Sequence, residues 1–165
     1  MKEGIKLLKI TVRKALERDI PELISMLMQV AKVHHDARPD IFKTGSKKYD
    51  EQELRTLLAD ELTAIFVAAD ESDTAVGYIF CMLHEYKNHF LMRDCKTLYI
   101  DDLCIDNTVR SSGIGRILYS HACAFAKLQG CYNITLNVWA GNDNALKFYE
   151  HLGLFEQKRT MEMIL

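Results

Sequence analysis

The sequence predicts a mixed α/β fold around a single sheet, and three observations support this prediction. Hydrophobic patterns typical of strands and of helices alternate along the chain, with no repeat and no low-complexity segment. A length of 165 residues with 48% hydrophobic content suits one compact domain covering residues 1–165. Residues 98–139 read as strand, helix and strand, and such a unit contains parallel strands joined by a right-handed crossover.

The first 40 residues predict a strand followed by a helix. Leu8 to Lys14 alternates apolar and polar residues, as a half-buried strand does. Asp19 and Pro21 are an N-cap and an early proline for a helix whose apolar positions continue to about Val33. The stretch 34–40 then breaks the pattern, because a residue before proline disfavours helix, so we expect a loop there.

The remaining elements follow in order. The pattern predicts a helix over 51–61, a hairpin of strands over 64–69 and 75–83, and a third β run over 98–105. It then predicts a helix over 113–128, a strand over 134–139, a short helix over 144–151 and a final strand over 155–165.

Charge and composition exclude several kinds of partner. The 21 basic and 23 acidic side chains nearly balance, so no overall field favours nucleic acid or an anionic membrane, and any anion site must be local. No stretch has the length of a signal-peptide core or a membrane span, so we expect a cytoplasmic protein. The five cysteines lack CxxC spacing, and the His34-His35-Asp36 run lacks a partner cluster; we therefore expect neither disulfides nor a metal site.

The loop Arg110-Ser111-Ser112-Gly113-Ile114-Gly115-Arg116 opens a helix straight after a strand and is a candidate anion site. Backbone N–H groups without helical partners point out of such a turn, glycines let a diphosphate approach, and the helix dipole and the two arginines favour negative charge. A tight turn without a ligand is the alternative. A nucleotide P-loop needs GxxxxGK(S/T), and a dinucleotide fold needs a third glycine where this chain has Leu118, so neither matches.

Two motifs in the right order resemble the GNAT superfamily of N-acetyltransferases. The loop matches the family's R/Q-x-x-G-x-G/A motif, and Asn142 to Leu154 resembles its N-x-x-A-x-x-F-Y-x-x-x-G-F segment, with leucine in place of the last phenylalanine. The N-terminal VRKALERDIPEL also looks like the family's opening strand and helix. The resemblance implies a GNAT-like fold, in which a mostly antiparallel sheet has a parallel pair at the cofactor site and is flanked by helices.

The resemblance also implies acetyl-coenzyme A (acetyl-CoA) as co-substrate. Pantetheine would pair with one strand, the pyrophosphate would lie in the loop, and two asparagines would contact the cofactor arm. The pantetheine strand is Leu103, Cys104 and Ile105, and the two asparagines are Asn142 and Asn144. The pyrophosphate loop consists of Arg110, Ser111, Ser112, Gly113, Ile114, Gly115 and Arg116. The two serines stand where the family often has basic residues or glycine, which weakens the charge of the loop but not its backbone cradle. For Cys104 we also weigh a catalytic thiol against a buried structural one.

Acetyl transfer requires a neutral amine, a donor to the oxyanion and an acid for the departing thiolate. By resemblance, Tyr149 is the tyrosine beside the cofactor sulfur, and its phenol is able to donate that proton. Packing of the short helix is the alternative role for this side chain.

Asp101 and Asp102 lie inside a β run, where carboxylates are disfavoured and adjacent side chains point to opposite faces. The segment Tyr99 to Leu103 resembles the strand of diamine N-acetyltransferases, which implies that Asp101 binds the substrate amine or helps to deprotonate it. Asp102 is the second choice, and a strand bulge would reverse the order. A local cap or salt bridge is the alternative role.

The leading hypothesis is an acetyl-CoA dependent N-acetyltransferase. It would act by direct attack in a ternary complex on a primary amine of a small molecule, a polyamine or a protein. A non-catalytic acyl-CoA-binding regulatory module is the alternative, and Tyr149 with the two aspartates favours the enzyme. A Rossmann-type nucleotide binder is a third reading, disfavoured by the absent third glycine. Homodimers are common in the resembled family, and no sequence feature decides the oligomeric state.

Overall fold

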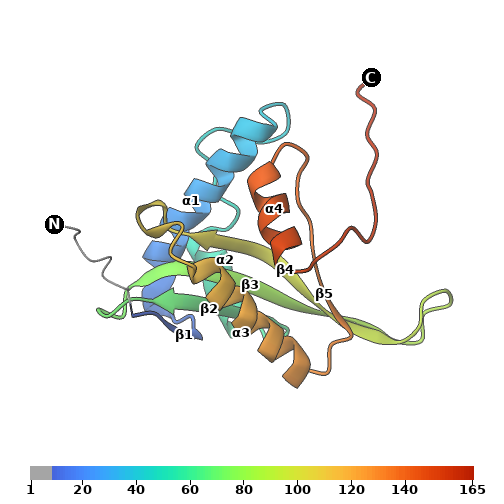
Figure 1. Cartoon of the computed structure of the whole chain (residues 1–165), viewed down its shortest axis with the longest axis horizontal. Coiled ribbons are helices and arrows are strands. Elements are labelled where there is room, and N and C mark those ends of the chain that lie inside the picture. The colour runs from blue at the N-terminus through green and yellow to red at the C-terminus, as the bar shows by residue number, and fades with distance from the viewer. Residues whose placement is uncertain (1–8) are drawn as a thin grey trace.

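The computed structural model describes residues 9–165, and within them five strands form one sheet in the order β1-β2-β3-β4-β5 (Figure 1). The strands are β1 (Thr11–Lys14), β2 (Thr63–Ala69), β3 (Ala75–Tyr86), β4 (Cys95–Ile105) and β5 (Asn133–Leu136). The helices are α1 (Ile20–Ala37), α2 (Glu51–Ala59), α3 (Ile114–Leu128) and α4 (Asp143–His151), with short 3₁₀ turns η1 (Glu17–Asp19) and η2 (Asn107–Val109). The predicted mixed α/β fold is confirmed.

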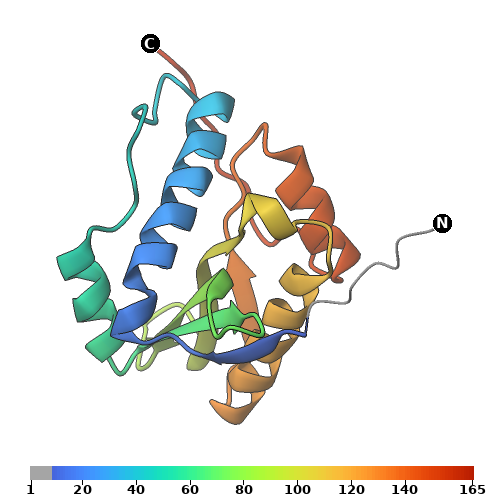
Figure 2. The ribbon, with the colours of Figure 1, turned by 90° about the vertical axis from the view of Figure 1, so that its left-hand side faces the viewer.

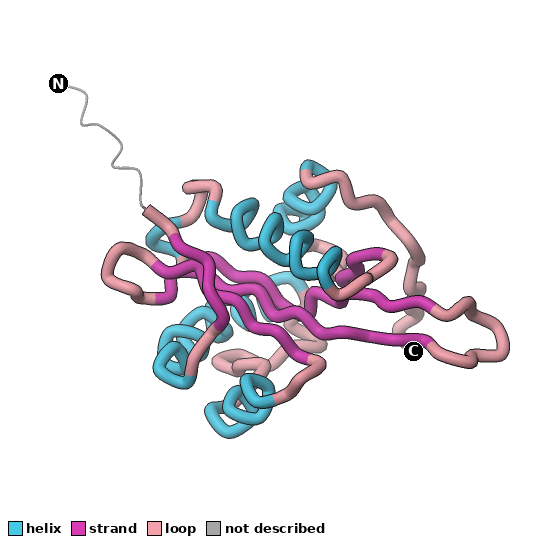
Figure 3. Tube along the Cα trace, turned by 90° about the horizontal axis from the view of Figure 1, so that it is seen from below, coloured by secondary structure: helices cyan, strands magenta, loops and turns pink. Residues whose placement is uncertain are grey.

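The sheet is antiparallel apart from one pair. β4 and β5 are parallel and are joined through α3, as predicted for a βαβ unit. α1 and α2 cover one face of the sheet with side chains such as Leu23 and Leu54, and α3 covers the other with Leu118 and Ala122 (Figure 2). Figure 3 shows helices on both sides of the twisted sheet and the β3–β4 hairpin projecting beyond them.

α1 runs further than predicted. It continues through both histidines to Ala37, because the proline restricts only the residue before it, and Arg38 (φ −141°) ends the helix. Asp19 occupies the N-cap position, but its carboxylate accepts from the Leu16 N–H (2.7 Å) and from the Arg13 guanidinium instead of from the helix. The predicted start of β1 at Leu8 lies outside the described residues.

The strand predicted over 155–165 is wrong. This segment is exposed and makes no backbone hydrogen bond to any described residue. A β-type pattern needs a neighbouring strand, and here a bidentate ion pair of Arg38 with Glu162 (2.9 and 3.0 Å) holds the segment against the end of α1. β5 also ends at Leu136, three residues before the predicted Trp139.

Candidate functional site

β4 and β5 separate midway along β4. Their pairing covers Thr97 to Ile100 on β4 and ends at Leu136 on β5, whereas β4 continues to Ile105 with β3 on one side only. Within the described chain, the outer backbone edge of residues 101–105 therefore has no strand beside it. Its amide groups are available to a bound molecule that carries amides of its own. Leu103, Cys104 and Ile105, predicted to pair with pantetheine, lie on this open edge.

The loop after β4 presents unpaired amides. Ser111 (φ 64°) and Gly113 (φ 82°) are left-handed, and Gly113 is the N-cap of α3. Within the part of the chain that the structure describes, the N–H groups from Ser111 to Gly115 find no protein acceptor. A Cβ added to Gly113 would meet nothing within 4 Å, so there is room above the turn. These amides at the start of a 15-residue helix suit a diphosphate.

Other residues of the loop support the turn. A Cβ on Gly115 would lie 3.1 Å from the Phe148 ring, so this glycine makes room for an aromatic side chain of α4. Arg110 Nε donates to the Ile105 carbonyl (3.2 Å), and the Ser112 hydroxyl donates to the Val109 carbonyl (2.6 Å). Ile114 anchors the loop in the core at 2% exposure. The N–H groups from Ser111 to Gly115 are thus hydrogen-bond donors that have no protein acceptor within the described residues.

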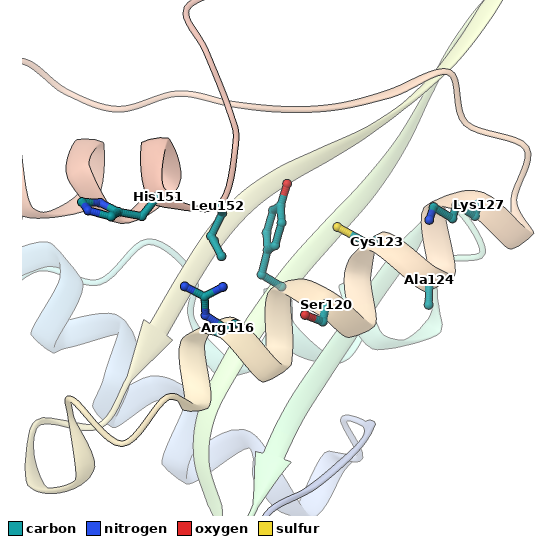
Figure 4. A pocket seen from close by; sticks show the side chains of 8 residues that line it. Arg116, Ser120, Cys123, Ala124, Lys127, His151 and Leu152 are labelled. Carbon is teal, nitrogen blue, oxygen red and sulfur yellow. The ribbon is translucent and has the colours of Figure 1, made fainter.

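Arg116 points into a hollow between α3 and the end of α4 (Figure 4). The hollow measures about 390 Å³ and is lined by Arg116, Tyr119, Ser120, Cys123, Ala124, Lys127, His151 and Leu152. Two cations and no carboxylate line it, so it complements negative charge and extends the electropositive start of α3.

The two asparagines have local surroundings. Asn142 caps α4, since its Oδ1 accepts from the Ala145 N–H (3.3 Å), and Asn144 is exposed on the first turn. Their contact with the cofactor arm stays a prediction.

A bulge places both aspartates on one face of β4. Phe80 pairs with Asp102 and the next residue of β3, Cys81, pairs with Ile100, so Asp101 is an extra residue in β4. Both carboxylates consequently lie on the face covered by α1 and α2. The simple alternation that we expected would have put them on opposite faces.

The two carboxylates have different neighbours. Asp101, whose side chain is 10% exposed, accepts from Lys48 Nζ (2.6 Å) and from the Tyr49 hydroxyl (2.7 Å). Asp102 accepts from the Tyr78 hydroxyl (3.0 Å). Burial raises the pKa of Asp102 from 3.8 to about 6, with Lys48 opposing the shift and Asp101 adding to it. Asp102 thus titrates nearer neutrality than an ordinary aspartate.

Lys48 and Tyr49 were not predicted as site residues from the sequence. They precede the N-cap Asp50, which forms a capping box with Glu53 at the start of α2. A cap fixes where a helix begins, but not that the two residues before it reach a strand more than 50 positions away.

Tyr149 and Cys104 differ in accessibility and chemistry. The Tyr149 hydroxyl makes no hydrogen bond within the described residues, and burial, then the Asp102 charge, raise its pKa well above its usual value. The phenol is therefore protonated at neutral pH and available as a donor. Cys104 is 3% exposed, its Sγ faces the Met26 carbonyl (3.7 Å), and burial raises its pKa to about 12. A thiol so seldom ionised does not suit nucleophilic catalysis.

Asp102→Asn should stabilise the protein above pH 6. Because the folded-state pKa is raised, ionisation of Asp102 costs stability as the pH rises from about 4 through 6. Asparagine has no such cost. The free energy of unfolding of the variant should therefore exceed that of the unmodified protein by about 2 kcal/mol at pH 8, after allowance for partial exposure, and by nothing near pH 3.5. Urea unfolding at both pH values measures it. The control Asp106→Asn should instead destabilise the protein at pH 8, since hydrogen bonds lower the pKa of Asp106 and its ionised form stabilises the fold. An equal effect of Asp102→Asn at both pH values would contradict the assignment.

The described residues contain neither a membrane-spanning helix nor a cluster of metal-ligating side chains. No helix among them is long and apolar enough to cross a membrane. They also contain no group of three or more His, Cys, Asp or Glu side chains that could hold a metal ion.

Comparison with known proteins places this geometry in a family. The model of the acetyltransferase (GNAT) family matches residues 27–154. Glucosamine 6-phosphate N-acetyltransferase of Trypanosoma brucei brucei is 31% identical over 65 residues, which are 39% of this chain and only 42% of that enzyme. Peptidyl-lysine N-acetyltransferase YjaB of Escherichia coli (strain K12) is 26% identical over 144 residues, covering 87% of this chain and 81% of that protein.

A solved structure is similar over nearly the whole chain. A mutant of the BH1408 protein from Bacillus halodurans superposes with a TM-score of 0.90 at 32% identity, covering 94% of this chain and 99% of that one. Glucosamine-6-phosphate N-acetyltransferase from Arabidopsis thaliana has a TM-score of 0.69 at 20% identity, covering 94% of this chain and 98% of that one, and so shares the fold. Because the family model matches more than half of its residues, the chain belongs to the acetyltransferase (GNAT) family.

Proposed function

We propose that the protein is an acetyl-CoA dependent N-acetyltransferase that acts on a primary amine. One observation carries the proposal: the open edge of β4 runs from the carboxylates of Asp101 and Asp102 to the amide cradle that ends at Gly115. A ligand with a diphosphate at one end, amides along its length and a reactive group at the other would match these features in turn.

Acetyl-CoA, when bound, supplies the activated thioester. The amides of Ser111 to Gly115 hold the diphosphate, and the edge of Leu103 to Ile105 orients the amide-containing arm. Tyr149 donates its phenolic proton to the departing sulfur, which its raised pKa permits at neutral pH. Asp101 binds the acceptor as an ammonium, and Asp102, with a pKa of about 6, accepts a proton through water.

The acceptor class follows from charge. The ion pair of Lys48 with Asp101 supports an ammonium group as the partner of this carboxylate. The names of two relatives fit this class, since one is a peptidyl-lysine N-acetyltransferase and the other a glucosamine 6-phosphate N-acetyltransferase. Diamines, predicted from residues 99–103, belong to the same class. A cytoplasmic location and a homodimer remain predictions.

Turnover with a panel of amines tests the proposal. The protein is mixed with acetyl-CoA and with a diamine, a lysine peptide or glucosamine 6-phosphate, and free thiol is followed. We expect release of thiol with at least one amine, and Asp101→Asn should raise the KM for that amine by about tenfold, as loss of a charged partner does. As a matched control, Asp94→Asn at the β3–β4 hairpin should leave KM unchanged. Tight binding of acetyl-CoA without turnover would favour the non-catalytic acyl-CoA-binding module.

A further inference from the structure

We propose that Lys48 is an acetylation site of this protein, modified by its own active site when no other acceptor is present. The inference rests on the proposed acetyl transfer and adds to it an acceptor within the chain. No residue of this kind was expected from the sequence.

Lys48 occupies the position that the proposed function gives to the substrate amine. Its Nζ lies 2.6 Å from Asp101 Oδ1 and 3.1 Å from the Asp101 carbonyl oxygen. Asp101 is the bulged residue where β4 and β5 begin to separate, beside the open edge. The Lys48 side chain is 42% exposed, whereas that of Asp101 is 10% exposed. A partly exposed lysine thus places its ammonium group against a nearly buried carboxylate.

The segment before α2 is held so that Lys48 stays there. Tyr49 stacks on Phe80 at 5.8 Å between ring centroids and donates to Asp101. On the other side of the segment, the Phe42 ring packs edge-on against Trp139 at 5.0 Å, and its carbonyl contacts His35 Nδ1. The position of the amine is therefore set by the fold and not by chance encounter.

Two neighbouring lysines provide a comparison within the same molecule. Lys43 and Lys47 lie in the same segment and are exposed, and neither forms an ion pair with a described residue. Unassisted acetylation by acetyl-CoA should favour these freer amines, because the Lys48 amine must first leave its carboxylate partner to reach a donor in solution. Faster acetylation of Lys48 than of Lys43 and Lys47 would thus indicate that the position of Lys48 within the site promotes the reaction.

The step balances in atoms and charge. The Lys48 ammonium loses one proton through Asp101 and Asp102 to solvent, and the nitrogen lone pair forms the C–N bond with the acetyl carbon. The C–S bond breaks, and the sulfur takes the Tyr149 proton. The second proton lost from nitrogen then reprotonates Tyr149. The products are acetylated Lys48, free coenzyme A and one proton, and no redox partner is needed.

Peptide mass spectrometry after incubation of the full chain with acetyl-CoA alone tests the inference. Acetylation at Lys48 should exceed that at Lys43 or Lys47 by about tenfold or more, since orientation raises the effective concentration of the amine. At saturating acetyl-CoA, its rate constant should not change on dilution of the protein, because the acceptor lysine and the site that acetylates it belong to one molecule. In Asp101→Asn, the Lys48 rate should fall to that of Lys47. In Lys48→Arg, which keeps the cation on Asp101, acetylation of the segment should fall to the level of the other two lysines.

Three outcomes would overturn the inference. Equal modification of the three lysines would show unassisted chemistry, and an apparent first-order rate constant that rises with protein concentration would show transfer between molecules. Unmodified Lys48 together with turnover of the amine panel would remove the internal acceptor but leave the proposed function intact. Absence of both reactions would instead contradict the proposed function.

Discussion

Gly113→Asp should abolish acetyl-CoA binding while the protein still folds. The residue is left-handed at φ 82° and caps α3, beside N–H groups that lack protein acceptors in the described chain. Aspartate would place a carboxylate where the diphosphate is expected, and this carboxylate would itself interact with the N–H groups and the dipole at the start of α3. We expect affinity to fall at least about 100-fold, equivalent to about 3 kcal/mol. Isothermal titration calorimetry with acetyl-CoA measures this loss.

Gly45→Asp is the matched control. Gly45 has φ 66°, and an added Cβ there also meets nothing within 4 Å, so both substitutions introduce the same strain and charge. A left-handed non-glycine residue costs about 1–2 kcal/mol, less for aspartate than for bulkier residues, and thermal unfolding should show similar losses in both variants. Only the Gly113 variant should lose cofactor affinity. If it binds acetyl-CoA as the unmodified protein does, the cradle assignment is wrong.

Tyr149→Phe should lower kcat by about 100-fold or more, the usual contribution of a positioned acid, with acetyl-CoA affinity nearly unchanged. The substitution removes one hydroxyl that makes no hydrogen bond in the described structure and keeps the ring beside Phe148 (5.1 Å between centroids). Because the pKa of the phenol is raised above its ordinary 10, no loss of rate from its ionisation is expected on the alkaline side of the pH profile below pH 10. Steady-state kinetics and cofactor titration separate the two effects.

Tyr132→Phe serves as the control for this variant, because Tyr132 is 82% exposed and lies outside the site. It should retain full kcat. An unchanged rate in Tyr149→Phe would leave this tyrosine a packing role, and the acid would have to be sought elsewhere, for example in bound water.

The elements were predictable because each depends on a local pattern. The apolar run of residues 64–69 and the helical spacing of 113–128 match β2 and α3 with shifts of one residue. The strand predicted over 155–165 failed, since its pattern is local but its pairing is not. The Arg38–Glu162 ion pair that directs this segment joins positions 124 apart, and no window of sequence reveals it.

The site was predictable in part for the same reason. The loop motif and the two aspartates are local, so their approximate place on β4 and at the start of α3 could be foreseen. The bulge at Asp101, the reach of Lys48 to it, and the role of Gly115 in accommodating Phe148 depend on contacts between distant segments. Physical proximity of this kind is decided by packing, which hydrophobic periodicity does not describe.

The extra residue in β4 makes the site sensitive to length as well as to side-chain identity. Deleting either aspartate would remove the bulge and restore regular alternation, and Ile100 and Leu103 would keep their β3 partners Cys81 and Ile79. The one aspartate that remains would pair with Phe80, and the unpaired position that meets Lys48 and Tyr49 would be lost. Exchanges of residue type should therefore be graded in effect at this position, whereas a one-residue deletion should remove one of the two adjacent carboxylates from the acceptor end of the site at once.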